Sequence, residues 1–309
     1  MIDYPDVQGT LPERPIPIQR VGVKGVYYPI QVKRSGRSIN LVANIDLSVD
    51  IPAERKGADI SRNLEAVNDI LGNGEIDGIE TVAKLLAEKL LDKIPYSNVS
   101  TVNIASDYFV QKRSESGKES MVKYRIYGKA NAGRGKSTVE SIGVEVKGMN
   151  ACPCAMEGTR AIMIDKFSKE SEFLASIPSI THNQRNTVKL TIQTSPENPV
   201  EVDDLIMVVE NVFGSPLLPL LKRSDEANIV YNAHMNPKFV EDIAREVVFQ
   251  TVMKYSGFPD STEIEVSSES DESIHPHNAF ASIATTFGSV RRASFMKVKS
   301  YMSLSNLHS

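Results

Sequence analysis

The pattern of apolar and polar residues divides most of the chain into two series of elements with the same order. Stretches in which apolar and polar residues alternate predict strands, and stretches with apolar residues three and four apart predict helices. The first series comprises strands at 20–34 and 38–52, helices at 61–71 and 80–94, and strands at 98–112 and 119–132. The second comprises strands at 138–148 and 187–194, helices at 202–213 and 236–255, and strands at 261–270 and 278–287.

Two series of ββααββ order predict an α+β fold with antiparallel sheets, each backed on one face by a pair of helices. Residues 150–186 fit neither series, and long insertions in compact proteins are often functional. We expect an N-terminal arm (1–19), a first unit (20–135), a second unit (136–290) and a C-terminal tail (291–309).

Local signals predict where two of the helices begin. Ser61 would cap the first helix, with Glu65 near the capping-box position and Leu64 on the buried face. Pro237 would lie in the first turn of the helix at 236–255, where proline is tolerated because that N–H has no partner within the helix.

Composition and charge narrow the class of protein. The 309 residues include 35 Lys and Arg against 39 Asp and Glu, a net charge of −4, which gives no electrostatic reason to bind nucleic acid. No apolar run approaches the roughly 20 residues that span a bilayer. The N-terminal residues do not resemble a signal peptide, and two cysteines exclude a disulfide scaffold. We therefore expect a soluble, cytoplasmic protein with neither a nucleic-acid nor a membrane partner.

A glycine-rich segment at 130–137, Ala-Asn-Ala-Gly-Arg-Gly-Lys-Ser, matches a degenerate phosphate-loop pattern in which Ala130 replaces the first glycine. Such a loop holds phosphate only when a helix N-terminus follows it. Here the following residues alternate as a strand, so the segment predicts a hairpin turn with Arg134 and Lys136 as plain charges.

Cys152 and Cys154 lie in Gly-Met-Asn-Ala-Cys-Pro-Cys at the end of a predicted strand. Alternate residues of a strand point the same way about 6–7 Å apart, which is too wide for easy disulfide geometry. Two interpretations stay open. The cysteines are either small buried hydrophobic side chains or, if other ligands lie nearby, part of a metal site.

Candidate ligands occur in short polar loops. His182 lies in Thr-His-Asn-Gln-Arg, and Glu272, His275 and His277 lie together just before the last strand. Cysteine, histidine and glutamate at strand edges are the ligand types of catalytic Zn, Fe or Mn. Taken alone, each histidine is better explained as a surface or capping residue. Its clustering with carboxylates in two short loops favours a metal site, so the two hypotheses stay open.

Two further acids have both an ordinary and a functional interpretation. Glu226 follows a proline-rich run and would be either a solvated loop residue or a ligand. Glu241 lies near the start of a predicted helix, off its apolar stripe, where a carboxylate complements the helix dipole.

Five motifs together resemble the GTP cyclohydrolases of type IB, and in particular their archaeal members. The motifs are GMNACPC (148–154), THNQR (181–185), LLKRSDE (220–226), NPKFVED (236–242) and ESIHPHNA (272–279). The resemblance implies the tunnelling fold, which has two ββααββ units per chain. The link at 155–181 is longer than in bacterial members, and this length resembles the archaeal enzymes.

The resemblance also implies a metal centre. Cys152 would be the metal-binding, catalytic cysteine with Cys154 as its companion, His182 would be the histidine at the metal, and Glu226 would be a further ligand. Fe(II) is the expected metal, with Mn(II) or Zn(II) as alternatives.

The implied reaction is the opening of the guanine imidazole ring of GTP at C8 with release of formate. Glu241 would anchor the guanine edge, and Glu272 and His275 would either join the metal ligands or transfer protons. In the archaeal relatives the products are 7,8-dihydroneopterin 2′,3′-cyclic phosphate and diphosphate, in the first step of methanopterin biosynthesis.

Three other functions remain open at this point. They are a type IB enzyme giving 7,8-dihydroneopterin triphosphate for folate, an NADPH-dependent nitrile reductase acting on a deazaguanine, and a non-catalytic purine- or pterin-binding oligomer. Because the edges of such sheets need to be covered, we expect a homodimer or homotetramer with sites at subunit junctions.

Overall fold

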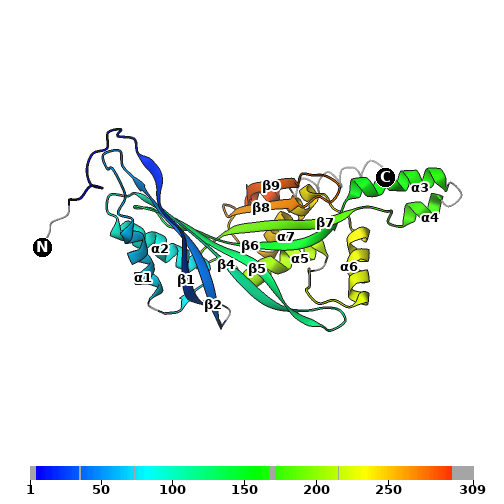
Figure 1. Cartoon of the computed structure of the whole chain (residues 1–309). Coiled ribbons are helices and arrows are strands. Elements are labelled where there is room, and N and C mark those ends of the chain that lie inside the picture. Colours follow the sequence, from blue (N-terminus) through cyan, green and yellow to red (C-terminus); the bar gives the residue numbers. More distant parts are fainter. Residues whose placement is uncertain (1–4, 35, 73, 168–170, 215, 294–309) are drawn as a thin grey trace. The chain divides into compact units, whose positions relative to one another are not determined.

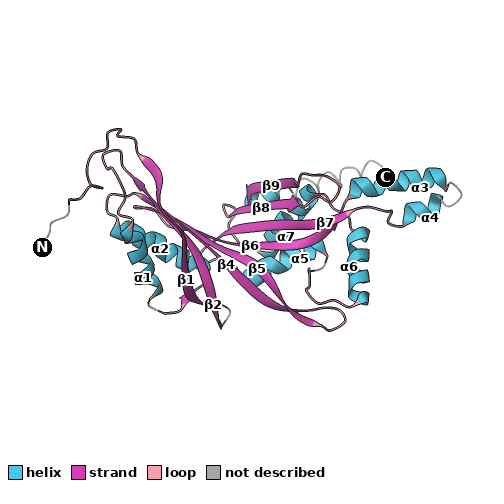
Figure 2. Cartoon of the chain, in the orientation of Figure 1, coloured by secondary structure: helices cyan, strands magenta, loops and turns pink. Residues whose placement is uncertain are grey.

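The computed structural model describes residues 5–34, 36–72, 74–167, 171–214 and 216–293. Within these residues both predicted series of strands and helices are present (Figures 1 and 2). The first series is β1 (Ile18–Arg34), β2 (Arg37–Ile51), α1 (Ser61–Leu71), β3 (Ile76–Asp77), α2 (Ile79–Lys93), β4 (Val99–Arg113) and β5 (Glu119–Gly133). The short β3 is an addition to the predicted order.

The second series contains further helices between its predicted elements. It runs β6 (Val139–Ala151), α3 (Pro153–Lys166), α4 (Ser171–Ser176), β7 (Asn183–Thr194), α5 (Val202–Phe213), α6 (Arg223–Met235), α7 (Val240–Lys254), β8 (Glu263–Ser270) and β9 (Ala279–Thr286). Without α3, α4 and α6 the order is again ββααββ, as predicted. No helix in the part of the chain that the structure describes combines the length and the apolar character needed to cross a membrane.

The strands follow the hydrogen-bonded order β3-β1-β2-β4-β5-β6-β7-β8-β9. The pairs β1–β2, β2–β4, β7–β8 and β8–β9 are antiparallel, and β3 lies parallel to β1. Contacts divide the chain into two compact units. The first takes residues up to 108, 125–143 and 193–199, and the second takes 109–124, 144–192 and the residues from 200 onward. The boundaries expected after residues 19, 135 and 290 remain predictions, and most of the expected tail lies outside the described residues.

In the first unit, α1 and α2 pack against each other on one side of the strands (Figure 1). Alternate residues of β2 face this core, as period-two side-chain alternation requires. The buried residues of β2 are Leu41, Ala43, Ile45, Leu47, Val49 and Ile51, and those of α2 include Val82, Leu86 and Leu90. In the second unit, α5 packs on α7, and α7 packs on β8 and β9.

One predicted helix cap and one predicted helix start are wrong, although α1 begins at Ser61 as predicted. Ile60 occupies the N-cap position of α1 without a side-chain cap, and Glu65 instead pairs with Lys93 at 3.3 Å. Leu64 is 45% exposed, because the buried face of α1 runs through Asn63, Ala66 and Val67. The last helix begins only at Val240, because Asn236 is the C-cap residue of α6 and Lys238 is hydrogen-bonded to the end of β6.

The hairpin turn predicted from the glycine-rich segment is confirmed. β5 ends at Gly133 and β6 begins at Val139, and Gly135 between them has φ +69°. Arg134 donates from Nε to the Ser97 carbonyl and from Nη2 to the Leu91 carbonyl, both at 2.6 Å. Its guanidinium therefore satisfies carbonyls at the C-terminal end of α2, a position that favours positive charge.

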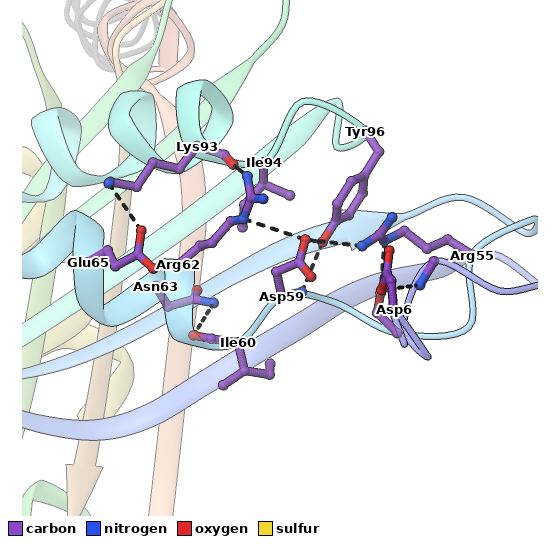
Figure 3. A network of polar contacts seen from close by, with 12 residues as sticks. Asp6, Arg55, Asp59, Ile60, Arg62, Asn63, Glu65, Lys93, Ile94 and Tyr96 are labelled. Carbon is purple, nitrogen blue, oxygen red and sulfur yellow. Dashed lines mark hydrogen bonds and ion pairs between the residues drawn. The ribbon is translucent and has the colours of Figure 1, made fainter. Parts of the chain in front are cut away.

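A second polar network holds the loop before α1 (Figure 3). Arg55 stacks its guanidinium over the Tyr96 ring, 3.8 Å from the centroid, and donates to Asp59 at 3.1 Å. The Tyr96 hydroxyl also donates to Asp59, at 3.2 Å, and Arg62 donates to the Lys93 carbonyl. The charged groups of this loop thus bind one another and the end of α2.

Candidate functional site

Cys152 lies where β6 gives way to α3. The strand ends at Ala151, Cys152 is the N-cap residue with extended backbone angles, and Pro153 takes the first helical position. The Cys152 Sγ accepts a hydrogen bond from the Ala155 N–H at 3.4 Å. The prediction that both thiols project the same way from a strand is therefore wrong, because proline at this position starts a helix. Cys154 lies in the first turn of that helix and is exposed, whereas Cys152 is half-buried.

Gly148 allows the end of β6 to approach α5 closely. A Cβ atom at this position would lie 2.2 Å from the ring of Phe213, the last residue of α5. No side chain fits in this space, so the glycine of the GMNACPC motif has a steric explanation.

Backbone hydrogen bonds bring His182 next to Cys152. The Cys152 N–H donates to the His182 carbonyl at 3.1 Å, and the Thr181 hydroxyl donates to the Cys152 carbonyl at 2.7 Å. His182 itself immediately precedes β7, and its Nδ1 lies 3.0 Å from the Ser273 Oγ. Two residues that are far apart in the sequence are thus neighbours where β6 ends and β7 begins, and these strand ends form one edge of the second unit.

The insert between these two residues folds back on itself. α3 and α4 pack together (Figure 1), and Arg160 on α3 donates from Nη1 to the carbonyls of Leu174 and Ile177, at 2.8 and 2.6 Å. Thr159 lies 3.0 Å from the Ser179 hydroxyl. These contacts hold the returning segment against α3, so that it re-enters the sheet at His182.

The loop that carries Glu272 is attached to the same edge. The Asp271 N–H donates to the Arg185 carbonyl at 2.9 Å, and the Gln184 Nε2 donates to the Glu272 Oε1 at 3.3 Å. His275 follows in this loop and stacks on His277, with ring centroids 5.2 Å apart. Both imidazoles are exposed.

The segment before α7 is also attached to the end of β6. The Lys238 N–H donates to the Ala151 carbonyl at 3.3 Å, and the Asn150 Nδ2 donates to the Lys238 carbonyl at 3.0 Å. Burial lowers the pKa of Lys238, and its Nζ donates to the Val212 carbonyl at 2.6 Å. Glu241 follows in the first turn of α7 with its side chain exposed.

Glu226 lies on α6. The hydrogen bonds described for this helix run to the turn between β4 and β5 and not to Cys152 or His182. Its neighbour Asp225 is buried and accepts hydrogen bonds from the Ser116 N–H at 2.9 Å and the Ser116 hydroxyl at 2.6 Å. Hydrogen bonds from the Lys222 N–H and from Ser116 lower the pKa of Asp225 to about 2. These bonds fix the start of α6 to the turn between β4 and β5, and Glu226 is exposed beside them.

The expected metal ligands agree with a metal site in donor type. A thiol from Cys152, an imidazole from His182 and a carboxylate suit divalent Zn, Fe or Mn; the expected carboxylate is that of Glu226, with Glu272 and the imidazole of His275 as candidate additions. Among the described residues of this single chain, however, no group of three or more His, Cys, Asp or Glu side chains is placed to hold a metal ion. The ligand set therefore remains a prediction.

Two site residues were not expected from the sequence. Asn150 and Gln184 lie inside the GMNACPC and THNQR motifs and are 6% and 9% exposed. Gln184 occupies the same face of β7 as the buried Val188 and Leu190. Amides at positions 184 and 186, where the alternation of β7 calls for apolar residues, are the signal that would have identified it.

The chain matches the model of one protein family, described as Type I GTP cyclohydrolase folE2, over residues 4–281. It is 41% identical over 293 residues to GTP cyclohydrolase MptA of Thermoplasma acidophilum, across 94% of this chain and 99% of the relative. It is 36% identical over 312 residues to GTP cyclohydrolase MptA of Methanosarcina mazei, across 94% of this chain and 97% of the relative.

Solved structures with low sequence identity share the fold. A uricase from Bacillus fastidious has a TM-score of 0.53 at 11% identity, across 89% of this chain and 96% of that chain. Urate oxidase from Bacillus subtilis 168 has a TM-score of 0.51 at 10% identity, across 87% and 98% of the two chains. These are tunnelling-fold proteins, so the predicted tunnelling fold is confirmed.

Proposed function

Because the chain belongs to the Type I GTP cyclohydrolase folE2 family, we propose that it is a metal-dependent GTP cyclohydrolase that forms 7,8-dihydroneopterin 2′,3′-cyclic phosphate, with release of formate and diphosphate. The family and its named relatives make the chain an enzyme with GTP as its substrate. The family therefore disfavours two of the alternative functions, the nitrile reductase and the non-catalytic oligomer. The metal, the cyclic phosphate and a first step in methanopterin biosynthesis are the proposed parts.

The observation that carries the proposal is the pairing of Cys152 with His182. Their backbones are joined by a hydrogen bond of 3.1 Å, and the loop with Glu272 is held to the same edge through Gln184. A helix N-terminus at Cys152 favours negative charge, which suits a sulfur ligand. Cys152 and His182 would hold the metal, and Glu226, Glu272 or His275 would complete the ligand set.

Ring opening requires water to add at C8 of guanine, a poor electrophile. When bound, a divalent metal supplies Lewis acidity and a water of lowered pKa for this hydrolysis. Glu241 would accept hydrogen bonds from the guanine N–H groups and so fix the position of C8. Glu272 and His275 would take the proton from the attacking water and return protons to the ring nitrogens as their bonds to C8 break. A second hydrolysis at the same carbon then releases it as formate.

A second copy of the chain would complete the assembly. β9 is the last strand in the hydrogen-bonded order of the described strands, so its outer edge offers backbone groups for pairing. We propose a homodimer or homotetramer, in which residues of a neighbouring copy contribute to each site.

The experiment uses the full chain, freed of metal with a chelator and kept anaerobic. We expect no formate from GTP until Fe(II) is added, partial activity with Mn(II), and a product whose mass is that of the cyclic phosphate. A triphosphate product would contradict the proposed cyclic phosphate. Full activity of the chelated protein would contradict the proposed dependence on a metal. His182→Ala should lower the bound metal measured by elemental analysis, which is a readout independent of activity.

A further inference from the structure

Two amides interrupt the apolar face of β7. Val188, Leu190 and Ile192 point into the core with no exposed surface, and Gln184 and Asn186 continue the same face at 9% and 0% exposure. A buried amide is costly unless it forms hydrogen bonds. The burial of the Gln184 amide therefore needs an explanation, whereas the burial of its apolar neighbours does not.

The Gln184 amide faces two acceptors. Its Nε2 lies 3.3 Å from the Glu272 Oε1 and 3.4 Å from the Asn150 Oδ1. Its Oε1 is buried without a hydrogen-bond partner among the described residues. Turning the amide over would place this oxygen against a carboxylate and another carbonyl oxygen. The two acceptors therefore fix the orientation of the amide, although its own oxygen is left without a partner.

Asn150 carries the connection further. Its Nδ2 donates to the Lys238 carbonyl at 3.0 Å, so its Oδ1 must face Gln184. The Lys238 N–H in turn donates to the Ala151 carbonyl at 3.3 Å. This reciprocal pair of bonds holds the residues just before α7, whose first turn contains Glu241.

We propose that Gln184 is a positioning residue for the reaction. Its amide orients the Glu272 carboxylate and, through Asn150, joins the Glu272 loop to the segment that leads to Glu241. This inference rests on the roles proposed above for Glu272 and Glu241. Gln184 is nine-tenths buried, and it acts on the substrate only through Glu272 and Asn150.

The test is Gln184→Met, which keeps an unbranched side chain of similar length and removes both the donors and the unpartnered oxygen. Because the bonds between Asn150 and Lys238 remain, binding of guanine should change little. We expect kcat for formate release from GTP to fall about tenfold to a hundredfold, the range for a hydrogen bond to a charged group. KM should stay within about threefold, since removing a purely catalytic interaction leaves ground-state binding in place.

Ser268→Ala is the matched control. The Ser268 hydroxyl is fully buried and donates to the Asn186 Oδ1 at 3.0 Å, in the same polar strip but away from Glu272 and Asn150. This variant should leave kcat unchanged, whatever its effect on the melting temperature. An equal loss of kcat in Ser268→Ala would show that buried polar packing alone explains the effect and would overturn the proposal.

A double-mutant cycle with Glu272→Gln tests whether Gln184 acts through Glu272. In the Glu272→Gln background, the further effect of Gln184→Met on kcat should be below about twofold, because residues that act as a unit are not additive. The proposal would be overturned if the effects of the two substitutions on kcat multiplied in the double variant, or if Gln184→Met kept the wild-type kcat. If Gln184→Met does not fold, Gln184→Leu, which is also uncharged and lacks the amide donor, takes its place in the cycle. Formate is released whichever pterin phosphate forms, so a different product mass contradicts the proposed product alone.

Discussion

The two ββααββ series share one order of elements but differ in what is inserted between them. Among the described residues, the first adds only the two-residue β3, whereas the second adds α3 and α4 after its first strand and α6 between its paired helices. Cys152 and His182 flank the first of these additions, and Glu226 lies in the second. The scaffold is therefore common to both halves, and part of the candidate chemistry lies where the second departs from it.

The polar groups of the two series are also used differently. In the first, Arg134 binds carbonyls at the end of α2, and Arg55 lies between Asp59 and Tyr96 (Figure 3). In the second, Glu241 and His275 are exposed beside a well-bonded edge. Arg134 and Arg55 thus stabilise loops, whereas Glu241 and His275 are exposed, in contrast to the bonded Asp225 of their own series. Variants in each series can test this difference.

The largest expected effect is that of Cys152→Ala in the second series. Formate release from GTP should fall at least about a hundredfold, as expected when a group essential to the chemistry is removed. The melting temperature should stay near that of the wild type, because the half-buried thiol makes one long hydrogen bond of 3.4 Å. Cys154→Ala is the control and should retain more activity. Near-wild-type turnover of metal-loaded Cys152→Ala would remove Cys152 from the site.

Glu241→Gln should have the next largest effect. The amide keeps the size of the side chain but loses its charge and turns N–H donors toward those of guanine, so kcat/KM should fall about tenfold to a hundredfold. Glu246→Gln, on the same helix and hydrogen-bonded to Gln250 at 2.6 Å, is the matched control. Steady-state kinetics on GTP measure both. Equal kinetics for the two variants would place Glu241 among ordinary surface residues.

Arg134→Met in the first series should change stability instead of activity. Loss of its bonds to the carbonyls of Ser97 and Leu91 should lower the free energy of unfolding by about 1–3 kcal/mol, since buried acceptors lose a charged donor. Denaturant unfolding measures this, and kcat per folded molecule should be unchanged. Lys136→Met in the same turn should have little effect. A loss of kcat in Arg134→Met would contradict the division between the two series.

The smallest effect concerns pH and Asp225. Its folded-state pKa of about 2 lies below the ordinary value of 3.8, so its contribution to stability is fully present above pH 3.8 and is lost as the pH falls toward 2. Protonation should loosen the start of α6 from Ser116. Thermal unfolding between these pH values should show the loss in the wild type, and Asp225→Asn should flatten it. An identical pH dependence in both proteins would exclude this cause.

Most strands and paired helices could be predicted because their apolar positions recur with a clear period. α6 could not, because among its residues only Asp225 and Ala233 are buried and the helix has no apolar stripe. The start of α3 was missed because the alternation of β6 continues up to Ala151, and Pro153 was not interpreted as a first helical residue. Propensity and periodicity act locally, and they are silent where tertiary contacts fix an element.

The candidate site was predicted through motifs and not through spacing. Residue types left a shared metal site of Cys152 and His182 as one of two hypotheses, and the resemblance decided between them, since nothing in residues 153–181 encodes the backbone bond that joins the two residues. Gln184 was missed although its burial on a strand face left a trace in the alternation. Its two acceptors come from segments distant in sequence, and such convergence is visible only in three dimensions.

The hydrogen bonds at the base of the α3–α4 insert have an evolutionary consequence. The Cys152 N–H and the Thr181 hydroxyl close the insert at its base, so the separation of thiol and imidazole does not depend on what lies between them. The entropic cost of closing a longer loop rises slowly with its length. Lineages can therefore lengthen, shorten or exchange this helical hairpin while the chemistry beneath it is inherited unchanged, and chimeras between relatives can be built at this junction.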